Sequence, residues 1–256
     1  MQIDGKRMVV TGAASGIGRA LLQQLAAYDL QLVAADIDEF RLQEAVEAIA
    51  KPDGQIVPFT CNLSLPHDVD DLFKFALDRM GGIDIFFANA GFGYYEHIER
   101  PDWGHIEEIY RTNVFSPIYA VEKMQEMHRD SPFYVVLTGS VLGRVALEGY
   151  ALYASTKSAL DRFVEGYRLE KRQNGRLVIA YPLPVRTDFF RAAGDAPIPQ
   201  LSQSADKVAT AIIRGVERDK ERIYTSPLLP LMLLIDRLFP PARRLYQRMD
   251  SRTFQR

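Results

Sequence analysis

Cysteine and histidine are scarce in this sequence, which limits the chemistry it can support. Cys61 is the only cysteine among 256 residues, and four histidines occur. One cysteine cannot form an intramolecular disulfide, and a cysteine-based zinc cluster is excluded. The histidines lack the spacing of metal ligands, so we expect no metal site. This composition is typical of a reducing compartment, and we expect a cytoplasmic protein.

Long blocks of one charge and signal-like apolar segments are also missing. The formal net charge is -2, and without a Lys/Arg block nucleic acid is not expected as a partner. The N-terminal residues Met1–Arg7 lack the apolar segment of a signal peptide. The chain is 47% hydrophobic and 25% charged, as in ordinary globular proteins. A small molecule is the expected partner.

Short apolar runs alternate with longer segments of helical periodicity. The runs that indicate strands are Arg7–Thr11, Gln31–Asp36, Gln55–Thr60, Asp84–Ala88, Phe133–Thr138 and Leu177–Tyr181. The segments that indicate helices are Gly16–Tyr28, Asp38–Ala50, Pro66–Met80, Trp103–Arg129 and Tyr150–Gln173. Each helix is long enough to connect two parallel strands. The pattern predicts an α/β fold with one doubly wound parallel sheet and helices on both faces.

No repeat or composition break divides the chain, so residues 1–256 are predicted to form a single domain. Its core is expected to span about 6–187. Prolines interrupt the periodicity after Tyr181, and a further helix is expected to begin near Ala205. Because this loop follows the carboxyl end of a strand, residues 188–204 are expected to line a substrate pocket. An apolar extension covers about 225–256.

A glycine-rich turn follows the first predicted strand and opens the first predicted helix. Glycines let the backbone approach a pyrophosphate, and a helix N-terminus offers free N–H groups. This position favours dinucleotide binding over a glycine-rich turn without a ligand. The residues expected to contact the dinucleotide here are Gly12, Ser15, Gly16, Ile17 and Gly18.

Asp36 ends the second predicted strand, where a carboxylate can accept hydrogen bonds from ribose hydroxyl groups. Its charge would repel a 2′-phosphate, and no Arg or Lys adjoins it in the sequence. NAD is therefore the preferred cofactor, with NADP not excluded. The other interpretation, a helix cap, fits Asp38 better.

Tyr153 and Lys157 lie one helical turn apart, so their side chains share a face. A lysine ammonium beside a phenol favours the phenolate, which suits general acid-base chemistry. The same spacing recurs at Tyr119/Lys123 and Tyr167/Lys171, which we interpret as solvated helix faces. Ser140 distinguishes the Tyr153/Lys157 pair from the other two. It follows the Phe133–Thr138 strand, so its hydroxyl is expected at the same carboxyl edge of the sheet as Tyr153.

The ordered motifs resemble those of the short-chain dehydrogenase/reductase family. They are Thr11-Gly12-x3-Gly16-x-Gly18, Asn89-Ala90-Gly91, Asn113, Ser140, Tyr153-x3-Lys157 and Pro182-x-Pro184-Val185-x-Thr187. The resemblance covers about Lys6 to Thr187. It implies a Rossmann-type fold and an NAD(P)-dependent oxidoreductase that interconverts an alcohol and a carbonyl.

The resemblance also implies roles for individual residues. Tyr153 would exchange a proton with the substrate oxygen, which Ser140 would orient. Lys157 would hold the nicotinamide ribose, and Asn113 would bind a water that connects Lys157 to solvent. The further residues expected to contact the cofactor are Asn62, Leu63, Asn89, Ala90, Gly91, Pro182, Val185 and Thr187, together with Tyr153 and Lys157.

Three positions depart from the family pattern. Leu183 stands where the family commonly has Gly, so the backbone beside the nicotinamide is less free to approach. Asn62 stands where an Asp often contacts adenine, although its amide oxygen can accept the same bond. Ala88 replaces a frequent Asn. The proton-transfer groups are retained.

The C-terminal region contains an uncharged, mainly apolar stretch from Thr225 to Ile235. Eleven residues are too few to span a bilayer as a helix, which needs about twenty. We expect residues 225–239 to form a lid or a subunit interface, and the alternative is a peripheral membrane contact. The family commonly forms homo-oligomers through its long helices.

Two other functions compete with the oxidoreductase. One is a non-catalytic dinucleotide sensor or membrane-peripheral scaffold of the same fold, against which the intact Ser140, Tyr153 and Lys157 argue. The other is a serine hydrolase, but Ser140 is not in a Gly-x-Ser-x-Gly motif and no histidine follows it.

Overall fold

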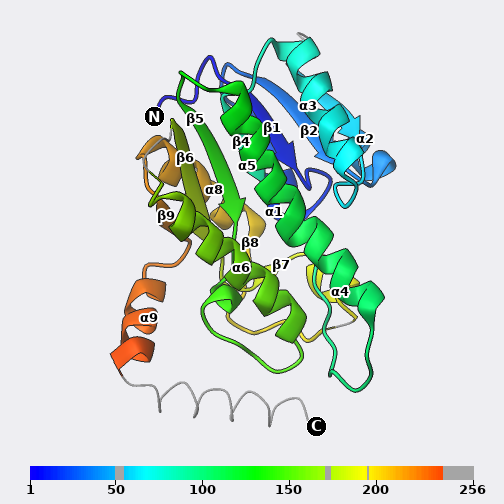
Figure 1. Ribbon diagram of the computed structural model, residues 1–256, viewed down its shortest axis with the longest axis vertical. Helices are drawn as coiled ribbons and strands as arrows, with labels where there is room; N and C mark the ends of the chain where they lie inside the picture. Colours follow the sequence, from blue (N-terminus) through cyan, green and yellow to red (C-terminus); the bar gives the residue numbers. More distant parts are fainter. Residues whose placement is uncertain (50–54, 171–173, 195, 239–256) are drawn as a thin grey trace.

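The computed structural model describes residues 1–49, 55–170, 174–194 and 196–238. Within these residues, seven strands form one parallel sheet in the order β3-β2-β1-β4-β5-β6-β9 (Figure 1). They span Arg7–Thr11 (β1), Gln31–Asp36 (β2), Ile56–Thr60 (β3), Ile85–Ala88 (β4), Phe133–Thr138 (β5), Gly175–Tyr181 (β6) and Arg222–Tyr224 (β9). The sequence predicts six of them but misses β9, because three residues show no periodicity.

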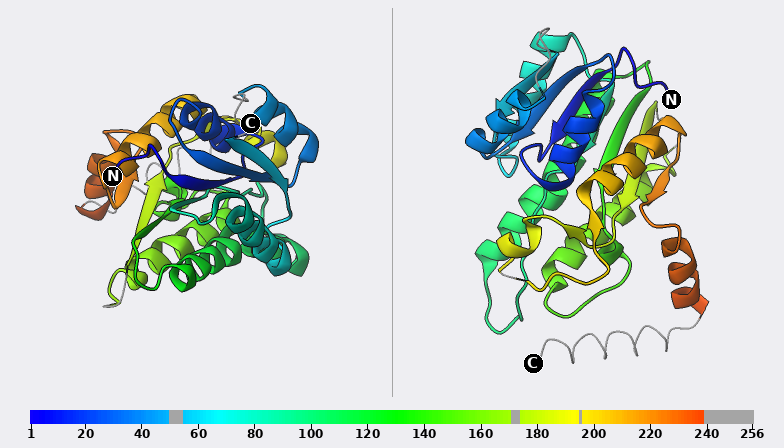
Figure 2. Two further views of the ribbon diagram at one scale, coloured as in Figure 1. Left: turned by 90° about the horizontal axis from the view of Figure 1, so that it is seen from above. Right: turned by 180° about the vertical axis from the view of Figure 1, so that it is seen from behind.

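Helices cover both faces of this sheet, which confirms the doubly wound architecture (Figure 2). One face carries α1 (Gly16–Leu25), α2 (Glu39–Glu47) and α8 (Ala205–Glu217); the other carries α3 (Pro66–Met80), α5 (Ser116–Met127) and α6 (Ala151–Tyr167). Successive residues of a strand point to opposite faces. Met8 and Val10 of β1 therefore enter the first core, whereas Val9 enters the second.

The predicted helix Trp103–Arg129 is wrong as one regular α-helix. It consists of α4 (Trp103–Tyr110), a π-helical segment η1 (Arg111–Phe115) and α5. Pro117 gives a physical reason, because it has no N–H to donate to the carbonyl four residues earlier, at Asn113. The Ser116 N–H instead bonds the Arg111 carbonyl, five residues back. Such segments occur frequently at functional sites.

Other helix ends also differ from the predicted ones. The helix predicted over Gly16–Tyr28 ends at Leu25, after which Ala27 and Tyr28 bond carbonyls three residues back. The predicted helix Tyr150–Gln173 ends at Tyr167. Its last residues, 171–173, lie outside the described chain, as does residue 50 at the end of the helix predicted from Asp38.

The loop after β6 is tied back at both ends. β7 (Val185–Arg186) pairs in parallel with β8 (Gln203–Ser204), and the Gln203 N–H donates to the Pro184 carbonyl at 2.7 Å. Between these two strands, α7 (Phe189–Ala192) holds part of the predicted substrate loop. The two ends of the loop are therefore tied to each other.

Helix α9 (Leu229–Leu238) forms most of the apolar C-terminal stretch and lies beyond the carboxyl edge of the sheet (Figure 1). Leu229 is buried, but Leu228, Leu231 and Leu234 are exposed. In the described part of the chain, no helix has both the length and the apolar character needed to cross a membrane.

Thr11 joins the two loops at which the sheet order reverses. Its Oγ1 donates to the Phe87 carbonyl at 3.0 Å and accepts from the Asn89 and Ala90 N–H groups at 3.0 and 3.1 Å. Thr11 is 2% exposed, so water cannot readily replace the hydroxyl. β1 and the end of β4 are thus fixed together where ligands bind in open α/β sheets.

Thr11→Val tests this junction, because valine keeps the shape of threonine and removes the hydroxyl. Three hydrogen bonds are lost; the Ala90 N–H loses its partner, whereas the Asn89 N–H and the Phe87 carbonyl keep their bond to each other, so the free energy of unfolding should fall by about 2 kcal/mol. Urea denaturation measures the change. Thr11→Ser keeps the hydroxyl and should lose about 1 kcal/mol, mostly from the missing methyl group. Equal losses in the two variants would show that packing, rather than the hydrogen bonds, holds the loops.

Candidate active site

A cavity of about 910 Å³ opens at the carboxyl edge of the sheet. Loops after β1, β2, β3, β4, β5 and β6 line it, together with residues of α9. Every sequence-predicted site residue lines this cavity except Gly18 and Asn113. The fold therefore assembles the predicted residues around one space of a size suited to a small molecule.

The glycine turn after β1 shapes one wall of the cavity. Gly12 has a φ of +66°, a left-handed conformation that favours glycine. Gly18 has another role, because a Cβ there would lie 1.9 Å from the Gly12 carbonyl oxygen. Its missing side chain lets α1 approach the turn, which explains why Gly18 is absent from the lining.

Asp36 lies in the cavity wall at the end of β2. Its Oδ2 accepts from the Ala14 N–H at 2.9 Å, which joins it to the glycine turn. Asp38 caps α2 as predicted, with the Arg41 N–H donating to its carboxylate at 3.0 Å. No Arg or Lys adjoins Asp36 in the sequence, but Arg41 of α2 lines the same cavity.

Arg41 reaches across from α2 to the loop after β6. Its guanidinium donates to Asp188 at 3.0 Å and lies 3.6 Å from Asp38. The partners Arg41 and Asp188 are separated by 147 positions. No local pattern could predict that an ion pair joins these two sides of the cavity.

Asn89 ties neighbouring strands together. Its Nδ2 donates to the Thr11 carbonyl at 3.0 Å, and its Oδ1 accepts from the Thr138 hydroxyl at 3.1 Å. The ends of β1 and β5 are thereby connected through the loop after β4. Asn62, another predicted cofactor residue, uses its Oδ1 to accept from the Ser64 N–H at 3.0 Å.

The opposite end of the cavity brings Ser140, Tyr153 and Lys157 together. Ser140 follows β5 and caps a short 3-10 helix, η2 (Val141–Gly143), through a bond from the Leu142 N–H. Tyr153 and Lys157 come from α6, with the lysine Nζ 5.6 Å from the tyrosine ring centroid. Lys157 donates to the Thr138 carbonyl at 2.8 Å. One strand end and one helix thus supply all three groups.

Burial dominates the titration of the two proton-transfer groups. It raises the pKa of Tyr153 to about 12, although a hydrogen bond with Ser140 lowers that pKa in part. Burial also lowers the pKa of Lys157 to about 8. The expected role of Lys157 in favouring the phenolate stays a prediction, and the Ser140 hydrogen bond offsets burial only in part. The phenol therefore keeps its proton at neutral pH.

Asn113 lies behind the cavity wall and is 1% exposed. Its Nδ2 donates to the Phe92 carbonyl at 2.8 Å and to Thr156 Oγ1 at 3.2 Å, while its Oδ1 accepts from the Phe92 N–H. The side chain therefore fixes the loop after β4 to α6.

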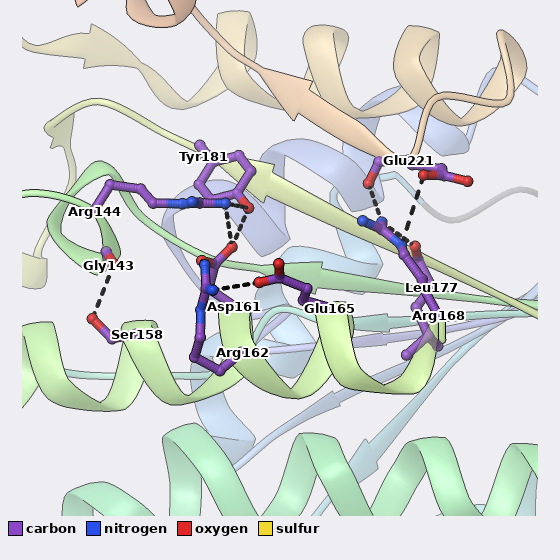
Figure 3. A network of polar contacts seen from close by, with 10 residues as sticks. All are labelled: Gly143, Arg144, Ser158, Asp161, Arg162, Glu165, Arg168, Leu177, Tyr181 and Glu221. Carbon is purple, nitrogen blue, oxygen red and sulfur yellow. Dashed lines mark hydrogen bonds and ion pairs between the residues drawn. The ribbon is translucent and has the colours of Figure 1, made fainter. Parts of the chain in front are cut away.

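A polar network anchors the Ser140 loop to α6 and β6 (Figure 3). Arg144 follows η2 and donates to Asp161 at 2.7 Å and to the Tyr181 hydroxyl at 3.0 Å. The Tyr181 hydroxyl also donates to Asp161, which is only 5% exposed. Asp161 lies one helical turn after Lys157, so the network holds Ser140 and Lys157 in one rigid unit.

In the other two Tyr-x3-Lys pairs, the described residues Tyr119, Lys123 and Tyr167 do not line the cavity, but they are not simply solvated. Tyr119 donates to Asp70 on α3 at 2.8 Å, and Lys123 forms an ion pair with the same carboxylate. Tyr167 donates to Gln125 at 2.7 Å, while Lys171 lies outside the described residues. Tyr119 and Lys123 therefore join two helices.

Aromatic residues around Tyr153 are a feature that the sequence did not predict. The centroid of the Phe189 ring lies 5.1 Å from that of the Tyr153 ring. The Tyr150 ring lies 6.4 Å from the Tyr153 ring, again between centroids. Gly93 permits this arrangement, since a Cβ there would lie 2.7 Å from Phe189. The only available signal was the paired aromatics at 189 and 190 in the predicted substrate loop.

Among the described residues, no cluster of three or more His, Cys, Asp or Glu side chains could hold a metal ion.

Residues 6–197 match the model of the short chain dehydrogenase family. The chain belongs to the short-chain dehydrogenase/reductase family.

Individual relatives agree with this assignment. An uncharacterized oxidoreductase of Listeria monocytogenes is 26% identical over 235 residues, or 86% of this chain and 94% of the relative. A short-chain dehydrogenase/reductase from Burkholderia phymatum, solved with NAD, is 21% identical with a TM-score of 0.84, covering 95% of this chain and 96% of that one. One from Sphingobium yanoikuyae, solved with NADPH, is 21% identical with a TM-score of 0.80, covering 93% and 94%. The solved structures establish the fold.

The buried Lys157 amine should make stability depend on pH in a specific direction. With a folded pKa of about 8, the folded chain binds fewer protons than the unfolded chain up to about pH 10.5, so stability rises with pH in this window. Below about pH 8 the amine is protonated in both states, and its burial lowers the free energy of unfolding by about 3 kcal/mol. Lys157→Met removes this cost and loses one hydrogen bond worth about 1 kcal/mol. The variant should be about 2 kcal/mol more stable at pH 7, and this gain should disappear by about pH 10.5.

Chemical denaturation at several pH values measures this difference. Lys123→Met is the matched control, because the hydrogen bond and charge of Asp70 outweigh burial and raise the pKa of Lys123. That lysine stabilises the fold below its unfolded pKa, so its removal should destabilise the protein at pH 7. A Lys157→Met variant that is less stable than the wild type at pH 7 would contradict the expected cost of burial.

Proposed function

We propose that the protein is an NAD(P)-dependent oxidoreductase that interconverts an alcohol and a carbonyl, with Tyr153 as the general acid/base. The observation that supports this most directly is the meeting of Ser140, Tyr153 and Lys157 at one end of a cavity whose other end holds the glycine turn and Asp36. Proton-transfer groups and a dinucleotide-type wall therefore border the same space.

The residues around the cavity fit a nicotinamide dinucleotide. Gly91 keeps the wall beside Lys157 open, since a Cβ there would lie 3.4 Å from Nζ and 3.0 Å from Asn113 Oδ1. Gly16 likewise keeps the wall open beside Thr187, because a Cβ on Gly16 would lie 3.1 Å from the Thr187 side chain. Gly12, Ser15, Ile17 and Thr187 would border the pyrophosphate. When bound, the dinucleotide would supply or accept the hydride.

The chain's own groups would handle the proton and the orientation of the substrate. In the reducing direction, the Tyr153 hydroxyl donates its proton to the carbonyl oxygen as the carbon receives hydride, and the oxygen becomes a hydroxyl group. Ser140 donates a hydrogen bond to that oxygen. The Lys157 ammonium, the main form at neutral pH of a group with a pKa of about 8, would stabilise the phenolate that remains. The high pKa of Tyr153 keeps the acid form available at neutral pH.

Asp36 favours NAD as the cofactor. Its carboxylate already accepts from Ala14 and Asp38, and its remaining lone pairs can accept from ribose hydroxyl groups. A 2′-phosphate would meet this negative charge. Arg41 already shares its charge with Asp188 and Asp38, which limits how far it could offset the repulsion, so NADP is the less favoured cofactor.

A dinucleotide sensor or membrane-peripheral scaffold is the alternative, and the assembled proton-transfer groups argue against it. A cytoplasmic location, homo-oligomeric assembly and a peripheral membrane contact of residues 225–239 stay predictions.

Tyr153→Phe should abolish most turnover, because it removes the transferable proton and little else. A loss of about 10²–10⁴-fold in kcat is expected, with the dinucleotide Kd within about twofold of wild type. Turnover is followed by nicotinamide absorbance over a panel of alcohols and ketones with both cofactors. Tyr119→Phe is the matched control, since that tyrosine has the same spacing to a lysine but binds Asp70 instead. If Tyr153→Phe turned over substrate as fast as the wild type, another group would have to be the proton donor.

Asp36→Ala should weaken NAD binding more than NADP binding. Loss of hydrogen bonds to a charged acceptor should raise the Kd for NAD by about tenfold or more. The Kd for NADP should fall or stay unchanged, because the repulsion is removed. Arg41→Gln serves as the comparison and should leave NAD affinity nearly unchanged. If the wild type already prefers NADP and Arg41→Gln removes that preference, Arg41 rather than Asp36 selects the cofactor.

A further inference from the structure

The cavity wall beyond Tyr153 is almost entirely apolar. Phe189 and Tyr150 pack directly on the tyrosine ring, and Phe190 packs on Phe189 at 5.6 Å. Aliphatic side chains continue the wall from the residue after Ser140 onward. They are Val141, Leu142, Val145 and Leu147. A substrate that occupies this end is surrounded by hydrocarbon.

The charged side chains that line the cavity are already engaged, among the described residues. Arg41 pairs with Asp188 beside Asp36, which puts all three at the dinucleotide end. Lys157 donates to the Thr138 carbonyl, and the Glu108 carboxylate accepts from the Tyr94 hydroxyl at 2.6 Å. No cation in the described lining is left to neutralise an anionic group on a substrate, so burial of such a group would be costly.

Helix α9 extends the apolar wall away from the catalytic groups. Leu229, Met232, Leu233 and Ile235 all line the cavity. Leu229 is 1% exposed and belongs to the core cluster against which Val141, Leu183 and Leu233 pack. Leu183 is therefore part of a continuous apolar surface that leads from the neighbour of Ser140 to α9. From Leu229 to Ile235 the helix rises about 9 Å.

We propose that the substrate is an uncharged carbonyl or alcohol that carries an extended aliphatic chain. The inference rests on the function proposed above. The reacting carbon lies at Tyr153 and Ser140, and the chain runs past Leu183 to the side of α9 that bears Met232. Each methylene that this wall removes from water should improve kcat/KM by about fourfold.

Two matched series of methyl ketones test the substrate class. One series carries an unbranched alkyl chain of about four to about twelve carbons, and the other ends the same chains in a carboxylate. In the alkyl series, kcat/KM should rise by about fourfold per methylene until the chain reaches the end of the apolar wall. The terminal carboxylate should remove most of this gain. A flat alkyl series, or faster turnover of the carboxylates, would overturn the proposal.

Two neighbouring residues of α9 give a matched pair of variants. Met232 lines the cavity and is 53% exposed, whereas Leu231 does not line it and is 55% exposed. Met232→Glu should reduce kcat/KM for the longest ketone by at least about tenfold, because the carboxylate faces the chain. Leu231→Glu should stay within about twofold of wild type. Equal effects of the two variants would contradict the path along α9.

Unreactive alkyl amides of the same lengths separate this inference from the proposed function. Their binding, measured by calorimetry on the full chain, should tighten with length in the wild type and in Leu231→Glu, but not in Met232→Glu. If no ketone or alcohol is turned over while amide binding follows this pattern, the oxidoreductase assignment fails and the apolar site stands. If short ketones are turned over while amide binding ignores length, only the substrate class fails.

Discussion

The burial of the Lys157 amine is the constraint on which the catalytic end depends. Only 4% of this residue is exposed, and burial lowers its pKa to about 8. Its neighbours are arranged to tolerate an amine at this depth: the Thr138 carbonyl accepts from Nζ, and Gly91 leaves room beside it. Gly143 lets the Ser140 loop lie directly on the α6 backbone, where a Cβ would come within 2.9 Å of the Lys157 carbonyl. The same close packing thus buries the lysine and brings Ser140 to the phenol of Tyr153.

The Arg144–Asp161–Tyr181 network carries this arrangement into the sheet. Removal of one partner from a buried ion pair is usually costly, because the other charge is left without compensation. Arg144 continues the Ser140 loop, Asp161 belongs to α6, and Tyr181 ends β6, so the three elements around the reacting groups share one set of bonds. Burial against this network explains why Ser140 and Lys157 stay in register although they derive from different elements.

The sequence predicts the layers and most site positions because both depend on local patterns. Six strands follow from apolar runs, and the Thr11–Gly18 turn is recognisable from its place between a strand and a helix. Three-residue β9 and two-residue β7 and β8 have no such pattern, since their pairing partners alone define them. The π-helical segment at Asn113 depends on a single missing N–H at Pro117, which helical periodicity does not reveal. The ion pair between Arg41 and Asp188 could not be predicted for a similar reason, because the two residues are far apart in the sequence and meet only in the folded chain. The apolar wall at α9 likewise exists only in three dimensions.

One short segment connects both halves of the cavity. Thr187 faces Gly16 in the glycine turn, Asp188 bonds Arg41, and Phe189 packs on Tyr153. The pairing of β7 with β8 ties the ends of this loop to each other. The partner of Arg41 and the ring that packs on Tyr153 are therefore consecutive residues, Asp188 and Phe189. Contacts with the glycine turn, with Arg41 and with Tyr153 thus come from three consecutive residues, so a shift of this segment would move all three together.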